Sequence, residues 1–472
     1  MSRSREVPTR KIERRVTVFE FEFFLTYVTL SEMKAALITL GCKLNQADTM
    51  ALAGILREAG YQIISGNEKA DLYLINTCTV TSCTDQQSRQ AIRQAARRNP
   101  SAFIIATGCY AQTDPQAIAR IEGVDLILGN REKSNLKEYL ATLSKTKDSP
   151  PHIVVGDISA SAEDGRGKDV APESSFRTRP LLKIQEGCNG KCAYCIIPRA
   201  RGTERSLPPH QVKRQLSGFL TQGFQEIVLT GIRLGAYGRD LAEAVTLCDL
   251  VGHLLQLSPG SWRLRLSSLE PQDISATTLI STLQGSSRVC RHLHLPLQSG
   301  DDEVLTAMNR TYRVETYRSL VEDLAHQIPG ISLGTDIIVG FPGETRERFL
   351  RTYHLLKELP LAYLHVFPFS PRPGTPAAAL VESVPPPEKK ERVRELRSLS
   401  REKSLEFRKK FIGTRLEVIV LRKRQERHGR WALSDNYLPM LIQDGTEEMV
   451  GQLFSVEIEG MEDGILLGRW KK

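Results

Sequence analysis

The chain has 472 residues, a formal net charge of +9 at pH 7 and nine cysteines. An apolar fraction of 40% and a charged fraction of 25% are typical of a globular protein with a sizeable core, which excludes a disordered or fibrous chain. No run of 18 apolar residues occurs, so the sequence predicts no membrane-spanning helix. The odd cysteine count and the lack of an export signal favour a cytoplasmic protein whose cysteines are metal ligands or core residues.

The first 32 residues differ from the rest of the chain. They carry mixed charges, and their short apolar patch contains Glu20 and Glu22. They lack the small-residue cleavage site of a secretory signal. Met33 precedes the first clean strand pattern, KAALITLG. We therefore interpret residues 1–32 as a disordered extension or as the product of a start codon assigned too early.

Residues 33–146 alternate strand-like and helix-like patterns. The strand candidates are KAALITLG, DLYLINT, AFIIATG and DLILGN, with amphipathic helical stretches between them. Strands that alternate with helices of ten to fifteen residues predict a parallel sheet in an α/β domain. Residues 147–175 are polar and rich in proline and glycine, which indicates a linker in which HIVV is the one strand candidate.

Residues 176–405 resume the alternation with six strand candidates. These are LLKIQEG, EIVLTG, RLRLSS, HLHLPLQ, DIIVGF and YLHVFPF. Six βα units fit a partial or full barrel or an open doubly wound sheet, and periodicity does not choose between them. A charged helical stretch follows, and five short strand patterns then predict a small β-barrel over residues 406–472.

Three cysteines form the pattern C-x3-C-x2-C within QEGCNGKCAYCIIPRARG. Cys188, Cys192 and Cys195 follow the first strand of the central region, and no fourth cysteine or histidine lies within ligand reach. A structural zinc ion needs four protein ligands, usually in two separated pairs, whereas neighbouring thiolates can bind separate irons of one cluster. We predict a [4Fe–4S] cluster with one open iron; a partial zinc site or three core cysteines are the alternatives.

Three more cysteines each follow a predicted parallel strand: Cys42 in TLGC, Cys78 in INTC and Cys109 in ATGC. The carboxyl ends of parallel strands share one edge of a sheet, so these thiols can converge despite their separation in sequence. Core packing gives no reason to favour strand ends. The pattern predicts a second cluster, with three unrelated core cysteines as the alternative.

Together these features resemble the radical S-adenosylmethionine (SAM) methylthiotransferases of the MiaB/RimO/MtaB kind. An aromatic residue, Tyr194, precedes the third cysteine of the signature, and the resemblance covers residues 34–472. The MtaB branch, which acts on N6-threonylcarbamoyladenosine at position 37 of tRNA, is the most similar. Its resemblance rests on TLGCKLNQADT, NTCTVTSCTDQQSRQ, LTGIRLGAYG, HLPLQSGDDEVLTAMNR, TDIIVGFPGET and HVFPFSPRPGTPA. The stretch ADTM departs from the branch, which more often has an aromatic and an acidic residue there.

The resemblance implies an N-terminal parallel α/β domain, a partial (βα)6 radical-SAM barrel and a C-terminal barrel similar to a TRAM domain. It also implies two [4Fe–4S] clusters, one on each cysteine triplet. The first would bind SAM and cleave it to a radical that removes hydrogen from C2 of adenine, and the second would carry the sulfur that is transferred. The expected SAM contacts are Tyr194, Gly231, Glu270, Gln298 and Asp336.

The implied substrate is the anticodon stem-loop of tRNA. Arg89, Arg93 and Arg97 recur every four residues, so they share one helix face that is predicted to bind phosphates, with a solvated charged face as the alternative. Trp431 and Tyr437 are candidates for stacking on bases, with core packing as the default.

A soluble electron donor such as flavodoxin or ferredoxin, a monomeric state and a cytoplasmic location complete the prediction. One alternative function is methylthiolation of isopentenyladenosine-37 in tRNA or of an aspartate in a ribosomal protein. An alternative of another class is a non-catalytic RNA-binding protein with structural metal sites.

Overall fold

The computed structural model describes residues 33–140, 149–158, 177–257, 260–381, 384–422 and 429–470. The interpretation of residues 1–32 and most of the predicted linker lie outside these ranges. No helix among the described residues is long and apolar enough to cross a membrane.

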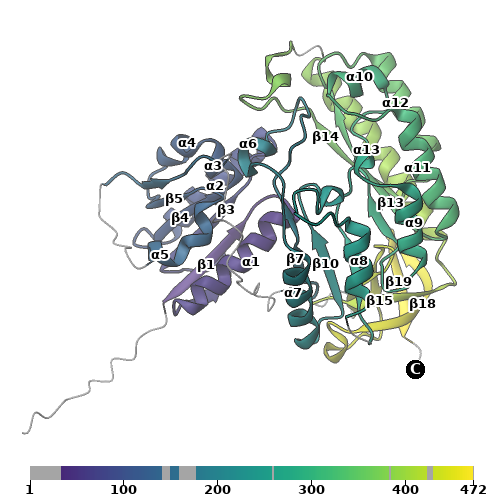
Figure 1. Ribbon diagram of the computed structural model, residues 1–472, viewed down its shortest axis with the longest axis horizontal. Helices are drawn as coiled ribbons and strands as arrows, with labels where there is room; N and C mark the ends of the chain where they lie inside the picture. Colours follow the sequence, from purple (N-terminus) through teal and green to yellow (C-terminus); the bar gives the residue numbers. More distant parts are fainter. Residues whose placement is uncertain are drawn as a thin grey trace, which may run out of the picture. The chain divides into compact units, whose positions relative to one another are not determined.

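The N-terminal region is a six-stranded parallel sheet with the order β2-β1-β3-β4-β5-β6 (Figure 1). The strands are β1 (Lys34–Thr39), β2 (Gln62–Ile64), β3 (Leu72–Thr77), β4 (Phe103–Gly108), β5 (Leu126–Leu128) and β6 (His152–Val154). The helices are α1 (Lys43–Glu58), α2 (Ser82–Arg98), α3 (Cys109–Thr113), α4 (Pro115–Ala119), η1 (Glu132–Asn135) and α5 (Leu136–Leu140). The predicted parallel α/β domain is thus confirmed, and the HIVV segment forms its edge strand β6.

Helices cover both faces of this sheet because its central strands are apolar on both sides. In β3, Leu72 and Leu74 share a core cluster with Leu52 of α1. Tyr73 and Ile75 point to the other face and join the cluster that includes Ile92 of α2. Successive side chains of a strand alternate between faces, so the continuous run LYLIN encodes a sheet that is buried on both sides.

The central region contains the six predicted strands in chain order. They are β7 (Leu181–Lys183), β10 (Glu226–Thr230), β11 (Arg263–Leu266), β12 (His292–His294), β13 (Ser332–Val339) and β14 (Tyr363–Pro368). They form two parallel three-stranded groups, and backbone hydrogen bonds from Leu264 to the segment before β12 join the groups. Within the described ranges no strand pairing joins β7 to β14, so the barrel is partial.

Helices pack outside this partial barrel around a large aliphatic core. They are α7 (Pro209–Thr221), η2 (Leu234–Ala236), α8 (Leu247–Leu255), η3 (Pro271–Asp273), α9 (Ala276–Gln284), α10 (Asp302–Ala307), α11 (Val314–Gln327), α12 (Arg346–Glu358), η4 (Pro376–Ala379) and α13 (Pro386–Lys409). The first predicted strand is interrupted: β8 (Gln185–Glu186) turns away to pair antiparallel with β9 (Arg205–Ser206). The loop between β8 and α6 (Ile197–Arg201) carries the cysteine signature.

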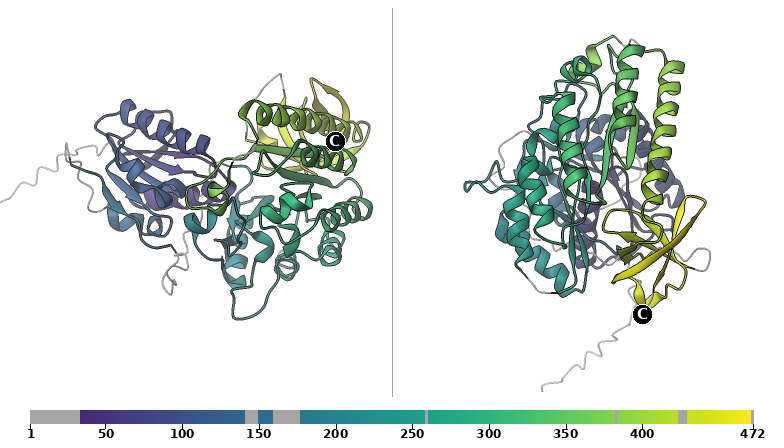
Figure 2. Two further views of the ribbon diagram at one scale, coloured as in Figure 1. Left: turned by 90° about the horizontal axis from the view of Figure 1, so that it is seen from above. Right: turned by 90° about the vertical axis from the view of Figure 1, so that its right-hand side faces the viewer.

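The C-terminal region is a closed barrel with the strand order β15-β16-β17-β19-β18, seen in the right-hand view of Figure 2. Its elements are β15 (Arg415–Val420), β16 (Arg430–Ser434), β17 (Pro439–Ile442), η5 (Glu447–Met449), β18 (Leu453–Glu462) and β19 (Ile465–Trp470). All five predicted strands are present, which confirms the predicted fold class.

The turn between β16 and β17 docks on two buried arginines of β11. Arg263 donates to the carbonyl of Leu433 at 3.0 Å, and Arg265 donates to the carbonyl of Asp435 at 2.8 Å. Both guanidiniums also bind the carboxylate of Glu226 in β10. Although burial opposes ionisation, Arg265 and Arg263 hold the pKa of Glu226 well below its usual value.

Candidate functional site

Cys42, Cys78 and Cys109 lie at the carboxyl ends of three adjacent strands. Cys42 is the N-cap of α1, Cys78 follows β3, and Cys109 is the first residue of α3 after β4. The strand ends are in register, since Asn76 lies opposite Thr39 on one side and Thr107 on the other. Burial, together with the nearby Cys109 and Cys42, raises the pKa of Cys78 to about 11. The predicted convergence of these three residues is therefore present in the structure.

Buried amides hold these strand ends together. The side-chain amide of Asn45 donates to the carbonyl of Leu40 at 2.8 Å and to that of Thr77 at 2.9 Å. The amide of Asn76 donates to the carbonyl of Asn45 at 2.9 Å. The bond to Leu40 closes the turn around Cys42, and the other two link the segments that carry Cys42 and Cys78. The hydroxyl of Thr77 donates to the carbonyl of Thr107 at 2.6 Å and so links the segments that carry Cys78 and Cys109.

Cys188, Cys192 and Cys195 share one loop whose own backbone fixes their positions. The amide of Cys188 donates to the carbonyl of Gly202 at 3.0 Å, and the amide of Cys195 donates to that of Cys192 at 3.1 Å. All three residues are partly buried. Burial, together with the neighbouring Cys192 and Cys188, raises the pKa of Cys195 to about 12.

The donor sets fit a multi-iron cluster better than a single metal ion. Among the described residues, the group of three His, Cys, Asp or Glu side chains whose ligand atoms all lie within 4.8 Å of one another is His294, Asp336 and His365. Neither cysteine triplet forms so tight a cage. Neighbouring thiols that lie farther apart suit a cluster in which each iron takes one protein ligand.

Glycines leave room beside a sulfur atom in both triplets. A Cβ atom at Gly41 would lie 2.6 Å from the Sγ of Cys78, and one at Gly190 would lie 3.1 Å from the Sγ of Cys188. Gly41 also has a φ of +92°, which other residues rarely adopt. The space on each sulfur, together with three thiol donors per site, is compatible with an inorganic cluster.

Arg310 connects the local triplet to one predicted SAM contact. Its guanidinium donates to the Sγ of Cys192 at 3.2 Å and forms an ion pair with Glu270. Glu270 follows β11 and Arg310 follows α10, so two barrel segments meet at the triplet.

Of the other predicted SAM contacts, Gly231 follows β10, Gln298 follows β12 and Tyr194 lies in the loop, whereas Asp336, expected at a strand end, lies within β13. Asp336 accepts a hydrogen bond from His294 at 2.9 Å, and its backbone carbonyl accepts one from the amide of Gln298 at 2.8 Å. Tyr194 packs beside an apolar cluster. A Cβ atom at Gly231 would lie 2.9 Å from the side chain of Gln185, so packing alone requires glycine there. Their roles in SAM binding stay predictions.

The chain matches two protein-family models and, over most of its length, several known proteins. Residues 34–129 match the family described as "Uncharacterized protein family UPF0004", and residues 182–356 match the Radical SAM superfamily. Two proteins named threonylcarbamoyladenosine tRNA methylthiotransferase MtaB are each 40% identical to the chain. The protein from Bacillus subtilis (strain 168) aligns over 89% of this chain and 92% of its own length. The protein from Aquifex aeolicus (strain VF5) aligns over 90% of this chain and 100% of its own length.

The chain belongs to the MtaB branch of the radical-SAM methylthiotransferases. It is an enzyme of this class. A sister branch is more distant: tRNA-2-methylthio-N(6)-dimethylallyladenosine synthase of Desulfitobacterium hafniense (strain Y51) is 31% identical over 93% of this chain and 98% of its own. The solved structure of TsrM, a radical SAM methyltransferase from Kitasatospora setae, covers 73% of this chain and 77% of its own with a TM-score of 0.52. At 16% identity this likeness shows a shared fold.

The three arginines predicted to form one basic helix face in this methylthiotransferase differ in exposure. Arg93 and Arg97 are exposed on α2 and line a shallow depression with Gln86, Gln90 and Gln94. Arg89 is half-buried and donates to the hydroxyl of Tyr110 at 2.8 Å. The surface available to a phosphate backbone is therefore centred on Arg93 and Arg97.

Three cations next to cysteines were not predicted from the sequence, namely Lys43, Arg201 and Arg310. Lys43 directly follows Cys42, and burial lowers its pKa. Arg201 contacts Cys109 and Arg310 contacts Cys192. Adjacency to a predicted ligand was a signal for Lys43, whereas no spacing rule marks the two arginines, since their sulfur partners lie far away in sequence.

Proposed function

We propose that this enzyme adds a methylthio group to C2 of N6-threonylcarbamoyladenosine at position 37 of tRNA. The observation that carries the proposal is the presence of two three-thiol sites within one compact unit. Identity of 40% to relatives named for this activity, over most of both chains, supports the choice of substrate.

We assign one [4Fe–4S] cluster to Cys188, Cys192 and Cys195 and a second to the strand-end triplet. When bound, the groups supply reductive cleavage of SAM and a sulfur atom for transfer. The chain positions the cofactor: Glu270, held by Arg310 near Cys192, offers an acceptor for the SAM ammonium. Gln298 and Asp336 offer polar groups for its ribose.

Cations near Cys42 favour an anionic substituent on the adenosine. The ammonium of Lys43 makes no hydrogen bond or ion pair with another residue in the described part of the chain. Tyr437 and Asp336 act on it with opposite charge, and Arg179 and Arg265 act on it with like charge. A threonylcarbamoyl group carries a carboxylate, whereas a dimethylallyl group is apolar. A partly buried cation without a partner stabilises the first and is left unpaired by the second.

Nucleoside mass spectrometry of tRNA from a strain that lacks the gene tests this function. We expect 2-methylthio-N6-threonylcarbamoyladenosine to disappear and to return on complementation. If it persists where no other enzyme makes it, the assignment is wrong. If the 2-methylthio derivative of isopentenyladenosine disappears instead, the sister activity is correct.

The proposal includes a flavodoxin- or ferredoxin-like electron donor, a monomeric state and a cytoplasmic location. Protein purified without oxygen should hold about eight irons per chain and cleave SAM when reduced. Zinc without iron, or an intact cluster that does not cleave SAM, would favour the non-catalytic RNA-binding alternative.

A further inference from the structure

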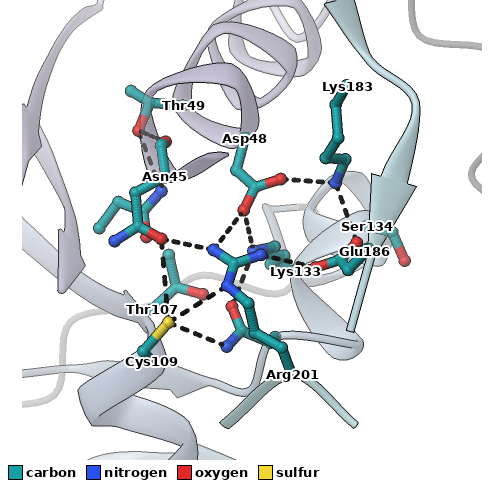
Figure 3. A network of polar contacts seen from close by, with 12 residues as sticks. Asn45, Asp48, Thr49, Thr107, Cys109, Lys133, Ser134, Lys183, Glu186 and Arg201 are labelled. Carbon is teal, nitrogen blue, oxygen red and sulfur yellow. Dashed lines mark hydrogen bonds and ion pairs between the residues drawn. The ribbon is translucent and has the colours of Figure 1, made fainter. Parts of the chain in front are cut away.

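Arg201 lies between the two cysteine triplets. It is the last residue of α6, six residues after Cys195, and its side chain is fully buried. Figure 3 shows its guanidinium beside the sulfur of Cys109, among Asn45, Asp48 and Glu186. The Nε of Arg201 donates to the Sγ of Cys109 at 3.3 Å.

The other nitrogen atoms of this guanidinium are held by three oxygen acceptors. One terminal nitrogen donates to Glu186 at 2.6 Å, in the strand that precedes Cys188. The other donates to Asp48 at 3.0 Å and to the side-chain oxygen of Asn45. Arg201 therefore joins the signature loop, α1 and α3 in one fixed geometry, because a planar guanidinium offers its donors in set directions.

The network around Arg201 holds more positive than negative side chains. Asp48 also binds Lys133 and Lys183, each at 2.6 Å, and Lys183 binds Glu186 at 3.0 Å (Figure 3). Arg201 and the two lysines supply three positive charges, and the two carboxylates supply two negative charges. This excess of positive charge faces the Sγ of Cys109 through Arg201, so it stabilises negative charge placed on that sulfur.

A second, neutral donor approaches the same sulfur. The side-chain amide nitrogen of Asn130 lies 3.8 Å from the Sγ of Cys109 and donates to the carbonyl of Ala200 at 2.7 Å. The oxygen of that amide accepts from Lys133 at 2.7 Å, which fixes its orientation. Residues from both domains thus direct N–H groups at one sulfur of the strand-end triplet.

We propose that Arg201 is a positioning and tuning residue for the cluster on Cys42, Cys78 and Cys109. Its charged N–H group stabilises the more negative, reduced form of the cluster and so raises the reduction potential. It also fixes Cys109 relative to the loop of the other triplet. This inference rests on the proposed second cluster.

The test uses the full-length chain with Cys188, Cys192 and Cys195 replaced by alanine, so that only the strand-end cluster contributes. Its midpoint potential is measured by redox titration followed by electron paramagnetic resonance. Arg201→Gln should shift the potential to a more negative value, and Arg201→Lys, which keeps the charge, should shift it less. Arg199→Gln is the matched control, because Arg199 is exposed on the same helix and donates to the carbonyl of Pro373.

The outcomes separate the inference from the function on which it rests. A background chain without iron refutes the second cluster, and the inference falls with it. A background chain with about four irons, whose potential is the same with and without Arg201→Gln, overturns the role of Arg201 and leaves the second cluster standing. Should Arg201→Gln fail to fold, Arg201→Lys decides, since Asp48 then keeps three cations: a negative shift supports the role and an unchanged potential overturns it.

Discussion

The two cysteine triplets reach similar donor sets by different routes. Cys188, Cys192 and Cys195 come from one loop that is stabilised by its own backbone hydrogen bonds. Cys42, Cys78 and Cys109 come from three strand ends, and their convergence depends on the register of β1, β3 and β4. A local motif carries its geometry with it, whereas a scattered site exists only when the whole sheet is correctly paired.

Their surroundings differ as well. The loop triplet meets Arg310 and Glu270 from the barrel, which are groups suited to a cofactor. The strand-end triplet contacts Arg201 through Cys109, Lys43 directly follows Cys42 in the chain, and the basic helix α2 begins four residues after Cys78. We infer that one side of the site serves SAM and the other serves sulfur and tRNA, and each variant below tests that division.

Removal of single cysteines should have the largest effect. Cys192→Ala and Cys78→Ala should each lose about half of the bound iron and all methylthiolation. Only Cys192→Ala should also lose SAM cleavage, measured as 5′-deoxyadenosine. Cys248→Ala on α8 is the control and should keep both activities. Loss of SAM cleavage in a folded Cys78→Ala protein would contradict the inference that the two triplets have separate roles.

Charge reversal on α2 should weaken substrate binding next most strongly. Arg93→Glu with Arg97→Glu should lower tRNA affinity roughly a hundredfold at low salt and reduce the salt slope by about two, because two phosphate contacts are lost. Filter binding across salt concentrations measures both. A control with Lys213→Glu and Lys357→Glu makes the same change in net charge on another surface. Equal losses in both variants would mean that only overall charge matters.

Replacement of Lys43 should affect the substrate and not the cofactor. Lys43→Gln should raise KM for tRNA that carries threonylcarbamoyladenosine about tenfold, since a charged hydrogen bond is lost. SAM cleavage without tRNA should stay unchanged, and Lys43→Arg should restore part of the affinity. An unchanged KM in steady-state assays would remove the charge argument for this substrate.

Loss of Glu226 should lower the free energy of unfolding and leave the functions of the two cysteine triplets unchanged. Glu226→Gln leaves Arg263 and Arg265 buried without their carboxylate, so it should cost about 3 kcal/mol. The folded-state pKa is depressed, so this contribution is complete above about pH 4.5 and is lost as the pH falls. Thermal unfolding should therefore show a difference in stability between wild type and Glu226→Gln at pH 7, and this difference should become smaller in acid.

The exposed partner of the same arginine provides the control for that experiment. Glu417 pairs with Arg263 but is half-exposed, so Glu417→Gln should cost less than about 1 kcal/mol. Similar costs for the two substitutions would show that burial of Glu226 does not set its contribution.

The sequence predicted features that depend on neighbouring residues. Strand periodicity identified most strands of the three regions but missed the short strands β2 and β9. The rule that parallel strand ends share an edge placed Cys42, Cys78 and Cys109 on one edge of the sheet. The signature spacing identified the loop triplet without any structure.

Features that depend on distant partners were not predicted. Arg201 binds Asn45 across 156 residues, and no local pattern encodes such a pairing. For Tyr437, packing inside the protein was the default expectation, and its ring stacks on His292 with centroids 4.2 Å apart, but the sequence did not indicate this partner. The turn that carries Tyr437 is held in place by hydrogen bonds from Arg263 and Arg265 to its backbone, so the ring packs against the protein.

The turn between β16 and β17 also limits which C-terminal barrels can be combined with this catalytic domain. The C-terminal barrel supplies backbone acceptors for two buried guanidiniums, and a buried donor left unsatisfied costs about 1–3 kcal/mol. A chimera that takes its C-terminal barrel from another protein would have to import a turn of the same shape. The barrel therefore completes the hydrogen bonding of the catalytic domain. We expect the two domains to be exchanged successfully only as a unit.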